Sequence, residues 1–196
     1  TLLLKSDGTI ATCGSNRVGQ CEIPALEEGL AYVQAVATIG YHSLLLKSNG
    51  AVVACGRNDC GECDIPTLEE DLSYTQVATG TRHSLLLKSN GQVAAFGRDW
   101  WDQSRVPPQG FLVPIAGTGP CDIPVLSEHL TCTQVAAGQD HSLLLQSNGA
   151  VRACGFNYHG ECNIPALEKT VTYTQVAAGG CFSILLRSSG TVAAFG

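Results

Sequence analysis

The feature that most constrains this chain is a nine-residue phrase that returns along its 196 residues at a nearly fixed spacing. Copies of His-Ser-Leu-Leu-Leu-Lys-Ser-Asn-Gly begin at His42 and His83, and a copy with one changed residue begins at His141. Two diverged copies lie near the two ends of the chain. The closing glycines are residues 8, 50, 91, 149 and 190, so the steps are 42, 41, 58 and 41. A period near 41 with one enlarged step indicates one structural unit built five times.

Each unit has the pattern of three short strands. A β-rich stretch such as residues 173–179 precedes the His-Ser-Leu-Leu-Leu stretch, and a third apolar run such as residues 51–56 follows it. Asn-Gly between the last two runs is a strong hairpin signal, because both residues tolerate positive φ. The unit then runs through a connector to Ile-Pro, where proline cannot donate to a strand ladder. With no helix-length periodic segment, the pattern predicts an all-β fold of three-stranded propeller blades; a β-solenoid is the alternative, although its repeats are usually shorter.

The units predict a single repeat domain over residues 1–196. We expect four and two-thirds blades, as part of a seven-bladed ring or an open arc. Such an arc has open strand edges, so we expect flanking sequence, a covering partner or an unusually small ring. The insertion at 108–124 contains an apolar Phe-Leu-Val-Pro-Ile run, which indicates a packed or partner-binding loop, or the remnant of a lost blade. The expected blades are 1–24, 25–66, 67–107, 125–165 and 166–196.

Charge and hydropathy exclude two classes of partner. The net charge is −6 and the chain has only 11 Lys and Arg, whereas nucleic-acid binders gain affinity by neutralising phosphates. No stretch approaches the roughly 20 apolar residues needed to cross a bilayer. No signal peptide is visible, and an intracellular location is favoured. We therefore expect a protein or multi-subunit partner, no direct nucleic acid and no transmembrane segment.

The recurring histidines and cysteines do not form a reaction centre in the sequence. His42, His83 and His141 start the same strand in successive copies, which predicts a structural role with each ring hydrogen-bonded to a loop. Cys60 and Cys63 form a lone Cys-x-x-Cys with no second pair, so no zinc or redox site is expected. No phosphate-binding glycine motif is present, and we predict no catalytic residues, cofactor or metal. Disulfides across the connector are possible in three copies, and small buried hydrophobes are the favoured alternative; the three pairs, each eight residues apart, are Cys13 with Cys21, Cys55 with Cys63, and Cys154 with Cys162.

These motifs resemble those of a known family. The string Gly-x-x-His-Ser-Leu-x-Leu-Lys-x-Asn/Asp-Gly-x-Val-x-Ala-Trp-Gly-x-Asn-x-x-Gly-Gln-x-x-Val-Pro is typical of regulator-of-chromosome-condensation repeats, and the short unit is most similar to the bacterial β-lactamase-inhibitor propeller. The resemblance implies a seven-bladed propeller whose loops on one face bind a protein. Members include an exchange factor for a small GTPase, enzyme inhibitors and modules of ubiquitin ligases. The chain departs from the family where Trp precedes Gly, and has instead Cys13, Cys55, Phe96, Cys154 and Phe195.

Positions that change from copy to copy indicate where recognition could occur. They fall in the loop between the first two strands and in the loop after the third, which antiparallel pairing places at one end of each blade. Exposed aromatic residues and Arg dominate protein interfaces. We therefore predict a non-catalytic interaction module or accessory subunit; the alternative is a regulatory propeller acting as a GTPase exchange factor or an enzyme inhibitor. The candidate partner-binding residues are Trp100, Trp101, Tyr158, His159, Tyr41, Arg82, Asp140, Phe182, Arg17 and Asp59.

Overall fold

The computed structural model describes residues 1–98 and 130–196 as a succession of small antiparallel sheets. Each sheet is a meander, and we call the sheets blades 1 to 5 in chain order. Blade 1 has two strands, β1 (Leu2–Leu4) and β2 (Ile10–Thr12), and each of the others has three. Blades 2 to 5 comprise β3 (Tyr32–Ala37), β4 (His42–Lys47) and β5 (Val52–Gly56); β6 (Tyr74–Thr79), β7 (His83–Lys88) and β8 (Val93–Gly97); β9 (Cys132–Ala137), β10 (His141–Gln146) and β11 (Val151–Gly155); and β12 (Tyr173–Ala178), β13 (Ser183–Arg187) and β14 (Val192–Phe195).

The hairpin between the second and third strands follows from its Asn-Gly or similar turn. Gly50 has φ 80° and lies in the left-handed region that glycine adopts without strain. A Cβ atom at this position would also lie only 2.4 Å from the Ser73 Cβ of blade 3, so a larger residue does not fit. The turn of one blade therefore packs directly against the start of the next blade. The same turn also accepts a backbone hydrogen bond from that blade, because Tyr74 N donates to Gly50 O at 3.0 Å. The equivalent bonds between the other neighbouring blades measure 2.9 Å.

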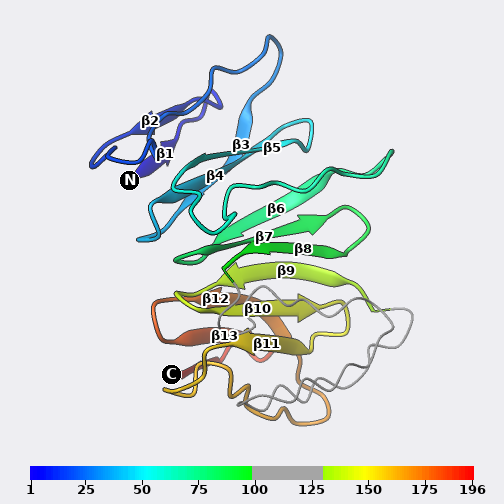
Figure 1. Ribbon diagram of the computed structural model, residues 1–196. Coiled ribbons are helices and arrows are strands. Elements are labelled where there is room, and N and C mark those ends of the chain that lie inside the picture. The colour runs from blue at the N-terminus through cyan, green and yellow to red at the C-terminus, as the bar shows by residue number, and fades with distance from the viewer. Residues whose placement is uncertain (99–129) are drawn as a thin grey trace.

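The blades lie side by side in chain order (Figure 1), and leucines of their middle strands pack between neighbours. Leu44 and Leu46 on β4 form one apolar cluster with residues of blade 3, including Val77 and Leu86. Alternation along the strand turns Leu45 to the opposite face, and it too is fully buried. A strand that is buried on both faces reads as a continuous apolar run, which explains the Leu-Leu-Leu repeat.

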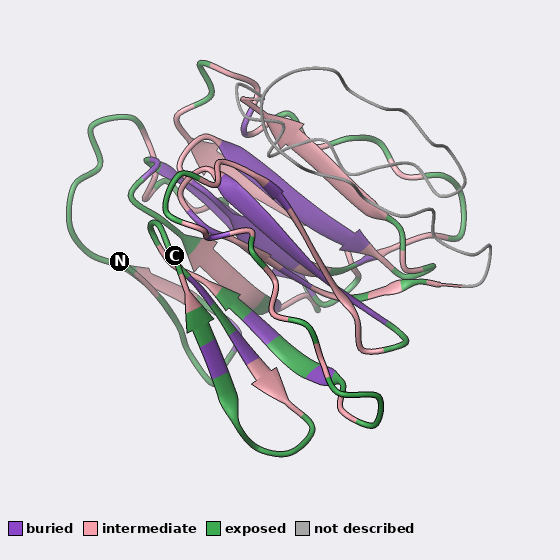
Figure 2. Ribbon diagram, turned by 90° about the horizontal axis from the view of Figure 1, so that it is seen from below, coloured by how far each residue is buried: buried purple, intermediate pink, exposed green. Residues whose placement is uncertain are grey.

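The two ends of the array differ from its middle. The blades in the centre of Figure 2 are largely buried, whereas the sheet beside the marked C-terminus alternates between buried and exposed residues. Leu143 of blade 4 is 0% exposed, but Ile184, at the same register position in blade 5, is 36% exposed. Leu3 in blade 1 is 56% exposed. The repeated faces thus lie open at both ends of the described array.

The structure contains the strands where the repeat predicts them. The bounds of the five expected units remain a prediction, and the insertion at 108–124 lies outside the described residues. Within residues 1–98 and 130–196, no helix is long and apolar enough to span a lipid bilayer.

Candidate interaction face

One end of the blades collects both sets of variable loops, and we call this end the loop rim. The loop before the second strand and the loop after the third are tied together in each three-stranded blade that the structure describes at both points. Arg57 N donates to Tyr41 O at 2.9 Å, and Phe156 N donates to Asp140 O at 2.8 Å. A third bond, Arg98 N to Arg82 O at 2.7 Å, does the same in blade 3. The sequence prediction that these loops share one end is therefore met in the described blades.

A buried polar relay holds neighbouring blades together just below the loop rim. The His42 ring lies 3.1 Å from Ser84 Oγ of the next blade, through Nε2. Ser84 Oγ in turn donates to the Glu62 carbonyl oxygen at 2.7 Å. Since that hydroxyl proton is committed to a carbonyl, the serine accepts a hydrogen bond from His42 Nε2–H. The same pairs recur as His83 with Ser142 and His141 with Ser183, both at 3.0 Å.

This relay corrects the expected partner of the histidines. The prediction of a structural role agrees with their burial, but Nε2 of each ring hydrogen-bonds a strand serine of the next blade where a loop was expected. The serine and histidine pair does not resemble an activated nucleophile, because the serine donates to a backbone carbonyl and is buried. Burial lowers the pKa of His83 to about 3, with further lowering by the nearby His42 and His141, so the ring is neutral at pH 7.

A second set of contacts between blades lies at the inner strands. Gln34 spans to blade 3 with both amide atoms, donating from Nε2 to Val77 O and accepting from Val77 N, each at 3.0 Å. Gln76 accepts from Val135 N and Gln134 accepts from Val176 N, both at 2.9 Å. Each glutamine therefore binds the backbone of the next blade, and we call these contacts glutamine clasps.

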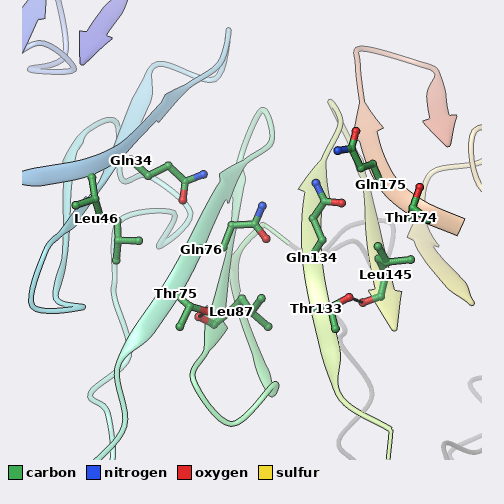
Figure 3. A pocket seen from close by; sticks show the side chains of 11 residues that line it. Gln34, Leu46, Thr75, Gln76, Leu87, Thr133, Gln134, Leu145, Thr174 and Gln175 are labelled. Carbon is green, nitrogen blue, oxygen red and sulfur yellow. Dashed lines mark hydrogen bonds between the residues drawn. The ribbon is translucent and has the colours of Figure 1, made fainter. Parts of the chain in front are cut away.

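The inner strands line a hollow of about 690 Å³ (Figure 3). Its walls carry the clasp glutamines and Gln175, together with threonines and a few leucines. Thr75 Oγ1 donates to Leu87 O at 3.2 Å within its own sheet. The described residues that line the hollow include no carboxylate, imidazole or amine, so this wall offers no general acid or base.

Exposed apolar side chains gather on the loop rim. Tyr158 is the most exposed of them at 82%, followed by Ile39 at 71%. Val18 and Tyr41 are also exposed there, whereas the described loops of the opposite rim carry mainly charged and small polar residues. Large apolar residues that are exposed on the same rim are candidates for an interaction site.

The loop of blade 2 departs from the repeat. Residues 38–41 form the link between β3 and β4, and the equivalent link in blade 3 is one residue shorter. This extra residue accounts for the first step of 42. It places Tyr41 at φ 65°, an unusual conformation for a bulky residue, and turns the Ile39 side chain out to solvent. Ile39 was not among the residues predicted from the sequence, although the longer step of 42 was a signal for it.

Blade 4 presents an aromatic group on the rim, made by Phe156, Tyr158 and His159. The Tyr158 ring stacks on Phe156 with centroids 6.2 Å apart, and His159 meets Tyr158 edge-on at 5.1 Å. The backbone of this turn is fixed by the buried Glu161, whose carboxylate accepts from His159 N at 2.8 Å. Tyr158 is therefore supported from beneath and displayed to solvent.

The structure places the other predicted residues as follows. Arg17 and Asp59 are exposed on the rim, and Asp59 pairs with Arg57 at 2.5 Å. Arg82 and Asp140 are only partly exposed. Phe182 was grouped with Tyr41, Arg82 and Asp140 in the sequence; it instead takes the histidine position of blade 5, and Cys181 is the true equivalent of Tyr41. Trp100 and Trp101 lie outside the described residues.

The cysteines have a more defined role than that of small hydrophobes. None of the nine described cysteines forms a disulfide. Cys63 donates from its thiol to Arg57 O at 3.2 Å, and Cys21 and Cys162 make the same bond in their own connectors. Burial, followed by the nearby Glu62 carboxylate, raises the pKa of Cys63 to about 12, so this thiol keeps the proton that it donates. In the part of the chain that is described, no group of three or more His, Cys, Asp or Glu is placed to hold a metal.

Comparisons with known proteins agree with this architecture. Residues 33–62 and 132–161 match the family model described as the regulator of chromosome condensation (RCC1) repeat. No curated protein matches the sequence at a significant level.

Solved structures of the same fold cover nearly the entire chain. Prp20p of Saccharomyces cerevisiae, studied for its binding to Gsp1p and histones, is 24% identical with a TM-score of 0.76, over 98% of this chain and 54% of its own. Yeast RCC1 (Prp20) bound to Kap60 is 22% identical with a TM-score of 0.75, over 98% of this chain and 53% of its own. Human WBSCR16 is 20% identical with a TM-score of 0.71, over 100% of this chain and 58% of its own. The chain thus spans little more than half the length of these structures. They confirm the all-β fold of propeller-type blades, while the similarity to the β-lactamase-inhibitor propeller remains a prediction.

Proposed function

We propose that the chain is a non-catalytic interaction module that binds another protein through the loop rim, in keeping with the two segments that match the RCC1 repeat. The observation that carries the proposal is the exposure of Tyr158, Ile39, Tyr41 and Val18 on that rim, against a charged opposite rim. A tyrosine held by an aromatic neighbour contributes a large contact area at a low cost in side-chain entropy. Yeast RCC1 (Prp20), a distant structural neighbour, binds a partner protein, Kap60.

The proposal is tested by comparing matched variants on the two rims. A photo-crosslinking residue is placed at Tyr158, and in a control protein at the exposed Glu168 of the opposite rim. Partners captured from the source cells are identified by mass spectrometry. We expect one partner to crosslink from Tyr158 and not from Glu168, and we expect Tyr41→Ala plus Tyr158→Ala to weaken its binding by about 2 kcal/mol or more. Equal capture from both rims, or unchanged affinity of a folded double variant, contradicts the proposal.

In the regulatory alternative the chain binds through the same rim, but binding changes the activity of the partner. An exchange factor accelerates nucleotide release from a small GTPase, and an inhibitor lowers the rate of its target enzyme. Either activity would be measured on the partner after it is identified. If binding of the chain changes neither the nucleotide release nor the turnover of the partner, the regulatory alternative is contradicted and the scaffold role is favoured.

A further inference from the structure

Ser43 of blade 2 is placed to accept a hydrogen bond that no described residue donates. It is 1% exposed, and its hydroxyl donates to the Gln20 carbonyl oxygen of blade 1 at 2.9 Å. The Cys55 thiol, paired with Ser43 across the sheet, donates to the same carbonyl at 3.6 Å and so does not supply a proton to Ser43. A hydroxyl oxygen that has given its own proton to a carbonyl can still accept one. Ser43 therefore presents a buried acceptor at the seam between blades 1 and 2.

The equivalent serines of the next three blades each accept from an imidazole ring. Ser84 donates to the Glu62 carbonyl oxygen at 2.7 Å and accepts from His42 Nε2 at 3.1 Å. Blades 4 and 5 contain the same pair of ring and hydroxyl, 3.0 Å apart. Blade 1 contributes no histidine to Ser43, because Thr1 occupies the serine position of its unit. Among the described blades, Ser43 is thus the one serine of this set that has the carbonyl partner and lacks the ring.

A cleft of about 240 Å³ lies at this seam and has Ser43 in its lining. Its walls come from the start and the connector of blade 1 and from the loop before β4 of blade 2. A cavity of about 150 Å³ is large enough to hold a benzene ring. The cleft therefore has room for the smaller imidazole ring beside the Ser43 hydroxyl.

We propose that this cleft is a binding socket for one imidazole ring, which donates from a ring N–H to Ser43 Oγ. The bound ring takes the place that His42, His83 and His141 take at the following seams. Ser43 keeps its bond to the Gln20 carbonyl, because the hydroxyl needs only its free lone pair to accept the ring. The socket thus continues an interface that the chain already forms three times.

The socket opens on the loop rim. Its lining includes Ile39 and Tyr41, which are 71% and 52% exposed. A histidine carried by a protein at the rim therefore has access to the cleft, and this use of the socket rests on the proposed function. Binding of the ring itself does not. A histidine directly before Thr1 would carry the same ring at the sequence position of His42, so the test includes both sources.

The test uses 4-methylimidazole, which is the histidine side chain without its backbone, on the 196-residue chain at pH 8. Binding is followed by NMR through the backbone amide shifts. We expect saturable shifts at the seam, at residues such as Tyr41 and Ser43, and none in blade 5. In 1,4-dimethylimidazole a methyl group replaces the hydrogen on the nitrogen equivalent to Nε2. This ligand should bind about tenfold more weakly, because it leaves the buried acceptor without a donor.

A matched pair of serine variants tests the acceptor. Ser43→Ala should weaken binding of 4-methylimidazole by about tenfold and remove the difference between the two ligands. Ser189→Ala removes an exposed hydroxyl from the turn between β13 and β14, and should bind both ligands as the parent does. If Ser43→Ala folds poorly, the comparison of the two ligands on the parent chain still decides.

Two extended chains locate the ligand and separate the sources of the ring. One histidine added before Thr1 should fill the socket, so that 4-methylimidazole no longer binds, whereas an added alanine should leave binding unchanged. Equal affinity for the two ligands, full binding by Ser43→Ala, or binding that persists beside the added histidine overturns the proposal. If the socket binds 4-methylimidazole but Tyr158 captures no partner, only the proposed function fails.

Discussion

The loop rim differs from the interfaces between neighbouring blades in how much its sequence varies, although the same repeat builds both. At the interfaces the sequence hardly changes: leucine, serine, histidine and glutamine recur at fixed positions and make the same bonds each time. On the rim, the equivalents of Tyr41 are Arg82, Asp140 and Cys181. Repetition therefore marks the residues that join blades, and variation marks the surface that is free to differ. The predictions below test whether stability and binding separate along this division.

The largest effect is expected from truncating a leucine inside an interface. Leu143→Ala removes a side chain that is 0% exposed, and should lower the free energy of unfolding by about 2–5 kcal/mol. Ile184→Ala at the same register position of blade 5 is the matched variant and should cost well under half as much, because Ile184 is 36% exposed. Urea unfolding measures both. Equal losses would mean that the face of blade 5 is covered.

The next effect is a loss of stability in acid through His83. Its folded pKa of about 3 lies below the unfolded value near 6.5, so the unfolded chain takes up the proton first. The stability linked to this ring is complete above pH 6.5 and is lost as the pH falls towards 3, by up to about 2 kcal/mol at pH 5. Unfolding is followed as a function of pH in the parent and in His83→Gln. A variant as acid-sensitive as the parent would remove His83 as a cause.

A smaller effect is expected from removing a glutamine clasp. Gln134→Ala leaves Val176 N–H without its acceptor and should cost about 1–2 kcal/mol. Gln175→Ala in blade 5 is the control, since no clasp from Gln175 to another described blade is formed. Thermal or urea unfolding of the two variants gives the comparison. Similar losses would show that the glutamine matters within its own sheet.

The smallest effect on stability is expected on the rim. Tyr158→Ala removes an 82% exposed side chain and should change the free energy of unfolding by less than about 0.5 kcal/mol. Its effect on partner binding should be several times larger. Strong destabilisation by Tyr158→Ala would mean that the aromatic group of blade 4 stabilises the fold. Residues on the rim could then not vary without a loss of stability.

The sequence predicts much of the fold because each unit carries local signals that agree with one another. The Asn-Gly turns, the leucine runs and the Ile-Pro connectors locate strands and loops, and antiparallel pairing places both variable loops at one end. The relay between His42 and Ser84 could not be read in this way, since its partners are 42 residues apart and belong to different sheets. Burial of Glu62 was equally hidden, because a glutamate in a glycine-rich loop suggests exposure. Phe182 directly precedes Ser183, as each histidine precedes its own serine, so the sequence carried the signal that would have placed it correctly.

The glutamine clasp has a consequence for how such a chain can change over time. Gln34, Gln76 and Gln134 grip main-chain atoms, which are the same whatever side chain the next unit carries. A freshly duplicated unit would therefore join its neighbour at once, with no matching substitution required on the other side. The glutamine clasp therefore allows the array to grow by duplication of a unit, after which the exposed loops can change in sequence.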